Sequence, residues 1–185
     1  KADEIRMNAI AEGGLSVLSD EEVPVAEFLP VIRSMSGAGK FSSTELRKQL
    51  AGITASVNID VDNYFSTVNA ACSPKDIETM LQLLYLNFAQ PRFDEADYNT
   101  LMKMIRSQLE NAKTNPDFVM EEHFIDAAYG HNPRRRMTTA EMTDEFRFET
   151  LPAIHEKLFP GADSFTFIFV GNVNLDTLKP LVEKY

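Results

Sequence analysis

The 185-residue sequence contains one cysteine, no tryptophan, and too few basic residues to balance its acidic ones. The single cysteine, Cys72, excludes an internal disulfide, and because free cysteines are usually buried we expect a buried thiol. With 18 Lys and Arg against 28 Asp and Glu, the net charge is −10. Nucleic acids and anionic membranes attract basic surfaces, so we expect neither as a partner. No apolar run approaches the roughly 18 residues of a membrane-spanning helix.

The common catalytic motifs are also absent. There is no glycine-rich phosphate loop, no G-x-S-x-G elbow and no C-x-x-C pair. Among the three histidines, His123 lies on a predicted helix, where a metal partner would be needed three or four residues later. Those positions hold Asp126 and Ala127, so only one pair is available and we expect no metal site. We expect His131 and His155 to be ordinary surface or boundary residues.

What remains is the composition of a globular protein, with 44% hydrophobic and 25% charged residues. The length suits one well-filled core, so we expect residues 1–185 to form a single domain. A strand is predicted from Glu4 onward, and the last predicted helix reaches Tyr185 without a stop signal. We therefore expect this domain to be part of a longer, multi-domain chain.

The hydrophobic pattern predicts four strands and a series of helices. Alternation of apolar and polar residues is clearest over residues 53–61, which with 64–71 we expect to form a hairpin. The apolar run 165–170 favours a strand buried on both faces. The predicted strands are 4–12, 53–61, 64–71 and 165–170, and the predicted helices are 24–37, 42–51, 73–88, 94–113, 118–130, a segment from 138 or 144 to 158, and 174–185. This order predicts an α+β fold, a two-layer sandwich with a largely antiparallel sheet and helices packed on one face.

Two helix termini carry recognisable signals. Ser42 is followed three residues later by Glu45, which is the capping-box pattern of a helix start. Within the predicted helix 24–37, however, Pro30 removes a backbone hydrogen bond and crowds the preceding turn, which costs about 3 kcal/mol in an ordinary helix. The apolar spacing predicts one continuous helix here in spite of this proline.

Arg134, Arg135 and Arg136 form the one basic cluster that suggests ligand binding. Guanidinium groups bind carboxylates and phosphates through paired hydrogen bonds, so these residues are candidates for binding the carboxylate of a substrate. The alternative is an ordinary solvated charge run.

The order of several short motifs resembles that of the insulinase/pitrilysin family of zinc metallopeptidases, the inverzincins, whose catalytic helix carries H-x-x-E-H. The similarity extends over nearly the whole chain. It includes a strand ending at Gly13-Gly14, an A-x-F-L helix ending in glycine, and the segments Phe41–Leu46, Gln90–Asp94 and Phe169–Leu175. The family fold implied by this resemblance is an α+β sandwich.

In a catalytic domain of that family, the helix would read H-F-L-E-H. Here the same five positions are Glu27, Phe28, Leu29, Pro30 and Val31. The resemblance places the third zinc ligand, a glutamate, near Gln108, with Glu110 as a neighbouring alternative. These degenerate positions imply that the domain has no catalytic residue and holds no zinc or other cofactor, while the parent protein contains zinc in another domain.

The resemblance implies a catalytically inactive domain that forms part of a peptide-binding chamber. Its partners would be the other domains of the same peptidase and the peptide substrate. The alternative is a protease-dead scaffold or interaction subunit with the same fold, and a third possibility is an unrelated binding module. Exported bacterial members of the family lead us to expect the cell envelope or periplasm, by analogy alone.

Overall fold

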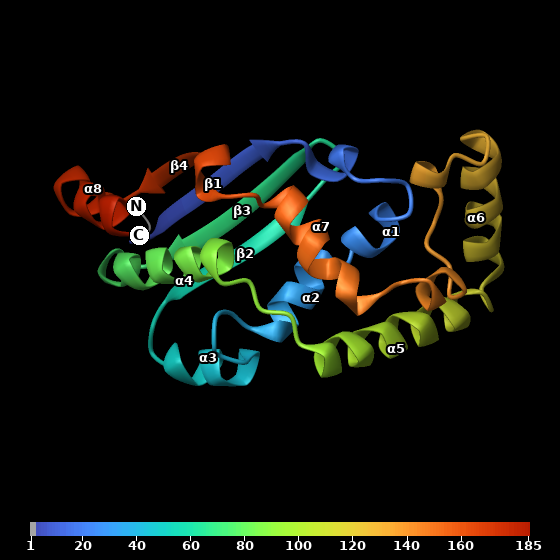
Figure 1. The fold of residues 1–185 in the computed structure, drawn as a ribbon, viewed down its shortest axis with the longest axis horizontal. Helices are drawn as coiled ribbons and strands as arrows, with labels where there is room; N and C mark the ends of the chain where they lie inside the picture. Colours follow the sequence, from blue (N-terminus) through green and yellow to red (C-terminus); the bar gives the residue numbers. More distant parts are fainter. Residues whose placement is uncertain (1–2) are drawn as a thin grey trace.

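The computed structural model describes residues 3–185 and places four antiparallel strands in one sheet, with the helices on one of its faces (Figure 1). The order across the sheet is β2-β3-β1-β4, so β2 and β4 are its edges. The strands are β1 (Ile5–Glu12), β2 (Ala55–Val61), β3 (Phe65–Cys72) and β4 (Thr166–Gly171). The predicted α+β sandwich is thereby confirmed.

The helices follow the predicted order, with short 3₁₀ turns between them. The α-helices are α1 (Val23–Ala26), α2 (Leu29–Ser36), α3 (Ser43–Gln49), α4 (Ile77–Ala89), α5 (Glu95–Ala112), α6 (Pro116–Ala128), α7 (Leu151–Leu158) and α8 (Leu175–Lys184). The 3₁₀ turns are Gly14–Val17, Pro74–Asp76, Pro133–Arg135, Met142–Asp144, Phe148–Thr150 and Ala162–Ser164. In the described part of the chain, none of these helices combines the length and hydropathy needed to cross a bilayer.

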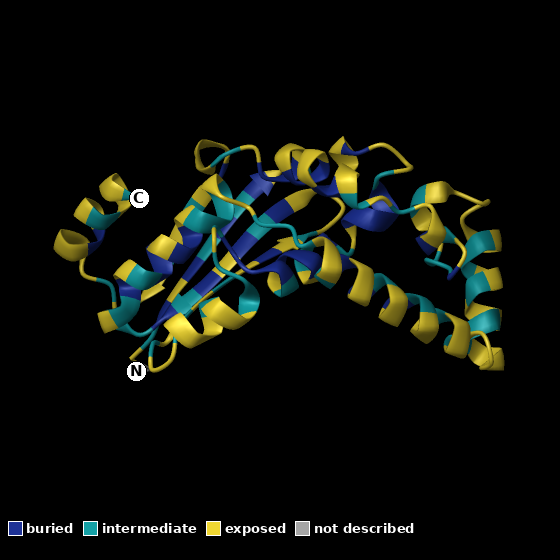
Figure 2. Ribbon diagram, turned by 60° about the horizontal axis from the view of Figure 1, so that its bottom comes forward, coloured by how far each residue is buried: buried dark blue, intermediate teal, exposed yellow. Residues whose placement is uncertain are grey.

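The two faces of the sheet differ sharply. On β1, alternate residues Ile5, Met7 and Ala9 are buried under the helices, while Arg6 is exposed on the opposite face. The same alternation on β3 buries Val68 and its neighbours at every second position. Helices α2, α4 and α7 cover the apolar face in Figure 1, and the buried residues in Figure 2 gather between them and the strands. The opposite face carries no helix among the described residues.

At two positions of the motifs that resemble the insulinase family, glycine is required because a side chain would collide with the backbone. Gly171 ends β4 at φ +127°, and a Cβ there would collide with the carbonyl oxygen of Glu4. Gly37 ends α2 at φ +85°, where a Cβ would collide with the carbonyl oxygen of Phe41. Glycine adopts these left-handed conformations without strain. The capping box is also confirmed, because Glu45 N–H donates to the Ser42 hydroxyl and the Ser42 N–H donates to the Glu45 carboxylate.

Outside the segment 24–37, two of the predicted helices and strands differ from the structure. The helix predicted from residue 138 or 144 begins only at Leu151, because Pro152 fits the first turn of a helix but not its interior. The apolar strand β4 is not buried on both faces, since Ile168 is 50% exposed and Val170 is 63% exposed. The reason is its position at the edge of a sheet with helices on one face only.

Candidate functional site

The predicted helix 24–37 is two helices. Glu27 and Phe28 separate α1 from α2, which corrects the expectation of one continuous helix. Pro30 has no N–H to bond to Ala26, and its ring would crowd that carbonyl in a continuous helix. The backbone therefore tightens, with the Phe28 N–H donating to Val25 O at 3.1 Å. Pro30 then lies in the first turn of α2, where a backbone donor is not needed.

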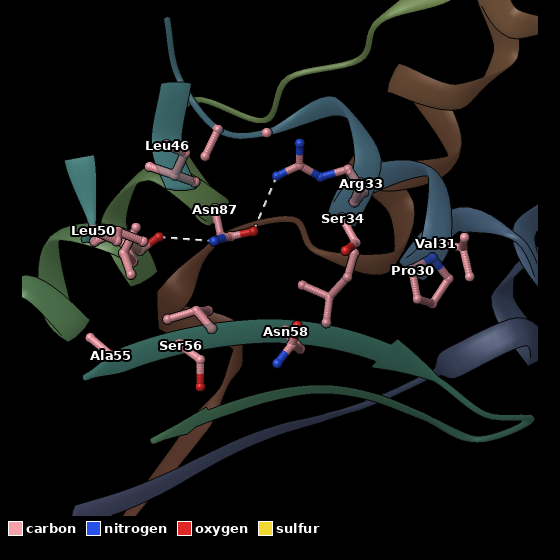
Figure 3. Close-up of a pocket in the computed structure, with 15 residues that line it drawn as sticks. Pro30, Val31, Arg33, Ser34, Leu46, Leu50, Ala55, Ser56, Asn58 and Asn87 are labelled. Carbon is pink, nitrogen blue, oxygen red and sulfur yellow. Dashed lines mark hydrogen bonds between the residues drawn. The ribbon is translucent and has the colours of Figure 1, made fainter. Parts of the chain in front are cut away.

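A groove of about 420 Å³ lies beside this break (Figure 3). Pro30, Val31 and Ser34 of α2 form one wall, and residues 55–59 of β2 form the opposite wall. Leu46 and Leu50, from α3 and its C-terminal end, line a further side. Because β2 is an edge strand, one row of its backbone N–H and C=O groups has no neighbouring strand in the sheet. The groove therefore combines an apolar lining with unused main-chain hydrogen-bonding groups.

Arg33 is one of the residues that line the groove and is only 3% exposed. Its Nη1 donates to the carbonyl oxygen of Arg92 at 2.6 Å, and its Nη2 donates to the amide oxygen of Asn87 at 3.2 Å. Its guanidinium carbon lies 5.3 Å from the ring centre of Phe93, a cation–π contact. Burial lowers the pKa of Arg33 to about 10, so it remains charged at neutral pH.

The ring of Phe93 also contacts the buried side chain of His155. The imidazole meets Phe93 edge-on at 5.8 Å and stacks on Phe159 at 5.1 Å. His155 is 3% exposed, so the expectation of a surface or boundary histidine was wrong. It lies four residues after Leu151 and three before Leu158, on the buried stripe of α7. Burial, together with the nearby charge of Arg33, lowers its pKa to about 3, and it is therefore neutral.

The arginine cluster does not converge on one point. Arg134 donates from Nε to the Asp20 carboxylate at 2.6 Å and from Nη1 to the carbonyl oxygen of Leu15 at 3.1 Å. Arg135 lies over the ring of Tyr129, with 5.8 Å between the guanidinium carbon and the ring centre. Arg136 lines a separate cleft of about 480 Å³. Binding of a substrate carboxylate by these residues stays a prediction.

The uncovered face of the sheet carries a row of asparagines. Asn58, Asn69 and Asn8 stand opposite one another on β2, β3 and β1. The Asn8 amide donates to Asn69 Oδ1 at 2.8 Å, and Ile168 on β4 completes the row. This face exposes amide groups and apolar side chains, among them Phe65, Ile168 and Val170.

The family model of the insulinase peptidases, peptidase family M16, matches residues 25–141, which is more than half of the chain. The chain belongs to the insulinase family. No curated protein matches the chain. The matched segment contains the break between α1 and α2, Arg33 and the residues that line the groove.

Solved structures with the same fold come from larger proteins. The periplasmic protease PqqL from Escherichia coli is 18% identical, with a TM-score of 0.87, and the match covers 100% of this chain and 20% of PqqL. A protease from Helicobacter pylori is 13% identical, with a TM-score of 0.77, and the match covers 100% of this chain and 45% of the Helicobacter protein. A peptidase M16 inactive domain from Pseudomonas fluorescens is 14% identical with a TM-score of 0.74, covering 98% and 44%. The chain thus spans about a fifth of PqqL, and at these identities the likeness concerns the fold.

The residues that the sequence resemblance predicts at the insulinase-family zinc positions do not fit a zinc ion. A catalytic zinc needs three protein ligands, whereas the side chain of Val31 offers no lone pair, and Pro30 cannot act as the general base. Glu27 lies at the helix break, where desolvation raises its pKa, and Gln108 is exposed on α5. The alternative residue Glu110 accepts a hydrogen bond from Arg106 at 3.0 Å. Within residues 3–185, no three His, Cys, Asp or Glu side chains are grouped so as to hold a metal ion.

Arg33 and Asn87 were not predicted from the sequence as residues of the site. The signal for Arg33 was its spacing, because Ile32, Arg33 and Ser36 follow Leu29 by three, four and seven residues, the pattern of a buried helix face. A charged residue on such a stripe is buried against its usual preference and therefore suggests a specific role. Asn87 carries no comparable signal.

Proposed function

We propose that this chain is a catalytically inactive domain of a larger zinc endopeptidase, in which another domain supplies the H-x-x-E-H site. The observation that supports this most strongly is the insulinase-family match and fold, together with the predicted placement of Glu27, Pro30 and Val31 at the zinc-site positions. A domain without ligands or general base contributes to proteolysis by binding and enclosing the substrate. The match to only 20% of PqqL is consistent with a multi-domain parent.

The groove beside Val31 is the proposed site of peptide contact. An extended peptide can add to the edge of a sheet, with main-chain hydrogen bonds giving affinity and pockets selecting side chains. Edge strand β2 provides the backbone groups, and Leu46 with Leu50 provides apolar lining. A volume of about 420 Å³ accommodates a few side chains of such a peptide.

The uncovered face of the sheet is the proposed chamber wall. Its asparagine row can exchange hydrogen bonds with peptide groups of any sequence, because an amide is both donor and acceptor. A related structure, a ferredoxin protease with a TM-score of 0.76, is in complex with Arabidopsis ferredoxin. That protease is 16% identical to this chain, and a protein substrate of this protein is part of the proposal.

The test uses the full-length protein and two matched tryptophan substitutions. Val31→Trp fills the groove, whereas Val17→Trp places the same ring on a comparably exposed position that does not line it. We expect Val31→Trp to raise the KM for a peptide about ten-fold without changing the zinc content, and Val17→Trp to leave both unchanged. Zinc and hydrolysis should disappear when the H-x-x-E-H motif of another domain is substituted. A full-length protein with no such motif and no hydrolysis would support the scaffold alternative instead.

A further inference from the structure

Arg33 is a buried positive charge without a negative partner. Among residues 3–185, no carboxylate forms an ion pair with it, although the chain has 28 acidic residues. Buried charges are normally paired, since removing a charge from water is costly. The contacts that do exist, to a carbonyl, an amide and an aromatic face, are all electrically neutral.

The guanidinium also has unused donors. It carries five N–H groups, and the carbonyl of Arg92 and the amide of Asn87 account for two of them. Nε is buried and has no hydrogen-bond partner. The bond to Asn87, at 3.2 Å, is longer than the 2.7–2.9 Å of a charge-assisted bond to a carboxylate.

The groove leading to Arg33 is suited to an anion. Arg33 is the one charged residue among those that line it, and no aspartate or glutamate lines it. Asn87 also lines the groove, and its side chain accepts the bond from the guanidinium and donates to Leu83 O at 2.9 Å (Figure 3). Asn87 therefore occupies, with a neutral oxygen, the position that a carboxylate oxygen would take.

We propose that this groove binds the carboxylate of a peptide, which accepts hydrogen bonds from Arg33 in place of the Asn87 amide oxygen. The inference rests on the proposed function of the groove as a peptide site and adds the chemical group that is recognised. The carboxylate can be a chain terminus or an acidic side chain, and the two sources are separable by experiment.

The experiment measures peptide binding to the full-length protein by fluorescence anisotropy, with a chelator present to prevent cleavage. One pair of labelled peptides differs only in a free or amidated C-terminus, and a second pair, both amidated, differs only in an internal Asp or Asn. In one of the two pairs, we expect the peptide with the carboxylate to bind at least about ten-fold more tightly than its amide counterpart. A difference of this size corresponds to one hydrogen bond between charged groups. A preference in the first pair identifies a terminal carboxylate, and a preference in the second identifies a side chain.

Asn87→Asp tests the site without removing Arg33. The new aspartate supplies the missing negative charge from within the protein, so the preference for carboxylate peptides should fall to less than about two-fold. Asn99→Asp adds the same charge at an exposed position of α5 and should keep the preference. Arg33→Gln, after its thermal unfolding has been checked, should also bind acid and amide forms equally.

Three results would overturn the inference. Equal binding of acid and amide forms by the unsubstituted protein would exclude carboxylate recognition while leaving peptide binding by the groove intact. A preference that survives both Asn87→Asp and Arg33→Gln would place the carboxylate elsewhere. No peptide binding at all would overturn the proposed function together with the inference.

Discussion

The guanidinium of Arg33 is held over the ring of Phe93, with 5.3 Å between the guanidinium carbon and the ring centre. The same ring also meets the neutral imidazole of His155 edge-on, with 5.8 Å between the ring centres. A single aromatic side chain thus contacts both a buried cation and a titratable group whose protonation would add a second charge. This arrangement gives the groove a fixed positive group and leads to the first two predictions.

Replacing Phe93 by leucine should destabilise the protein by about 1–2 kcal/mol, because a desolvated cation–π contact and an aromatic pair are lost together. The free energy of unfolding from urea titration measures this. Phe41→Leu is the matched control, since its ring meets Lys40 Nζ at 5.5 Å at a site closer to solvent. Its effect should remain below about 1 kcal/mol. Equal effects for both substitutions would show that the Arg33 contact adds nothing.

His155 should make stability fall as the solution is acidified. Its pKa is about 3 in the folded protein against an ordinary value of 6.5, so the unfolded chain binds a proton more readily. Below about pH 6.5 the free energy of unfolding should therefore decrease, by up to about 1.4 kcal/mol per pH unit, until the pH nears 3. Carboxylates titrate in the same range, so the informative quantity is the difference from His155→Phe. That difference should be constant above pH 7 and should change steadily below pH 6; a constant difference throughout would contradict the buried neutral imidazole.

Much of this fold could be predicted from the sequence because its signals are local. The alternation in β1 and β2, the capping box at Ser42 and the glycine at the end of α2 each specify the backbone through neighbouring residues. The exposure of β4 could not be predicted in this way. An apolar run has the same pattern whether one face of its strand is covered or both, and the outcome depends on what packs on the sheet.

The site was predictable only in part. The placement of Glu27, Pro30 and Val31 at degenerate zinc positions comes from the sequence resemblance and stays a prediction. The division of the helix at Glu27 was within reach, because a proline without a backbone donor fits a first turn better than an interior position. The contact between Arg33 and Asn87 joins residues 54 positions apart, and nothing local indicates such a pair.

Arg134 should matter for stability more than its neighbour does. It ties the loop after α6 to Asp20 and to the carbonyl oxygen of Leu15, so Arg134→Ala should lower the free energy of unfolding by about 1–3 kcal/mol. Arg135→Ala removes an exposed stacking contact with Tyr129 and should change it by less than about 1 kcal/mol. Chemical denaturation of the two variants side by side measures the difference. A larger loss for Arg135→Ala would contradict the described role of Arg134.

Restoring the catalytic motif alone should not restore a zinc site. The triple variant Glu27→His, Pro30→Glu and Val31→His provides two imidazoles and a general base, but Gln108 still offers no carboxylate as third ligand. The zinc content of the full-length protein, measured by mass spectrometry, should therefore not increase by one ion per chain. Addition of Gln108→Glu is the matched comparison, and a stoichiometric increase in the triple variant itself would contradict Gln108 as the third position and favour Glu110.

The central claim is that residues 1–185 contribute no metal centre and no chemistry of their own. Its most direct test is zinc analysis of this segment, purified, shown to unfold cooperatively, and incubated with zinc before extensive dialysis. We expect much less than one zinc per chain and no peptide hydrolysis. One tightly bound zinc per chain, with hydrolysis lost on chelation, would contradict it.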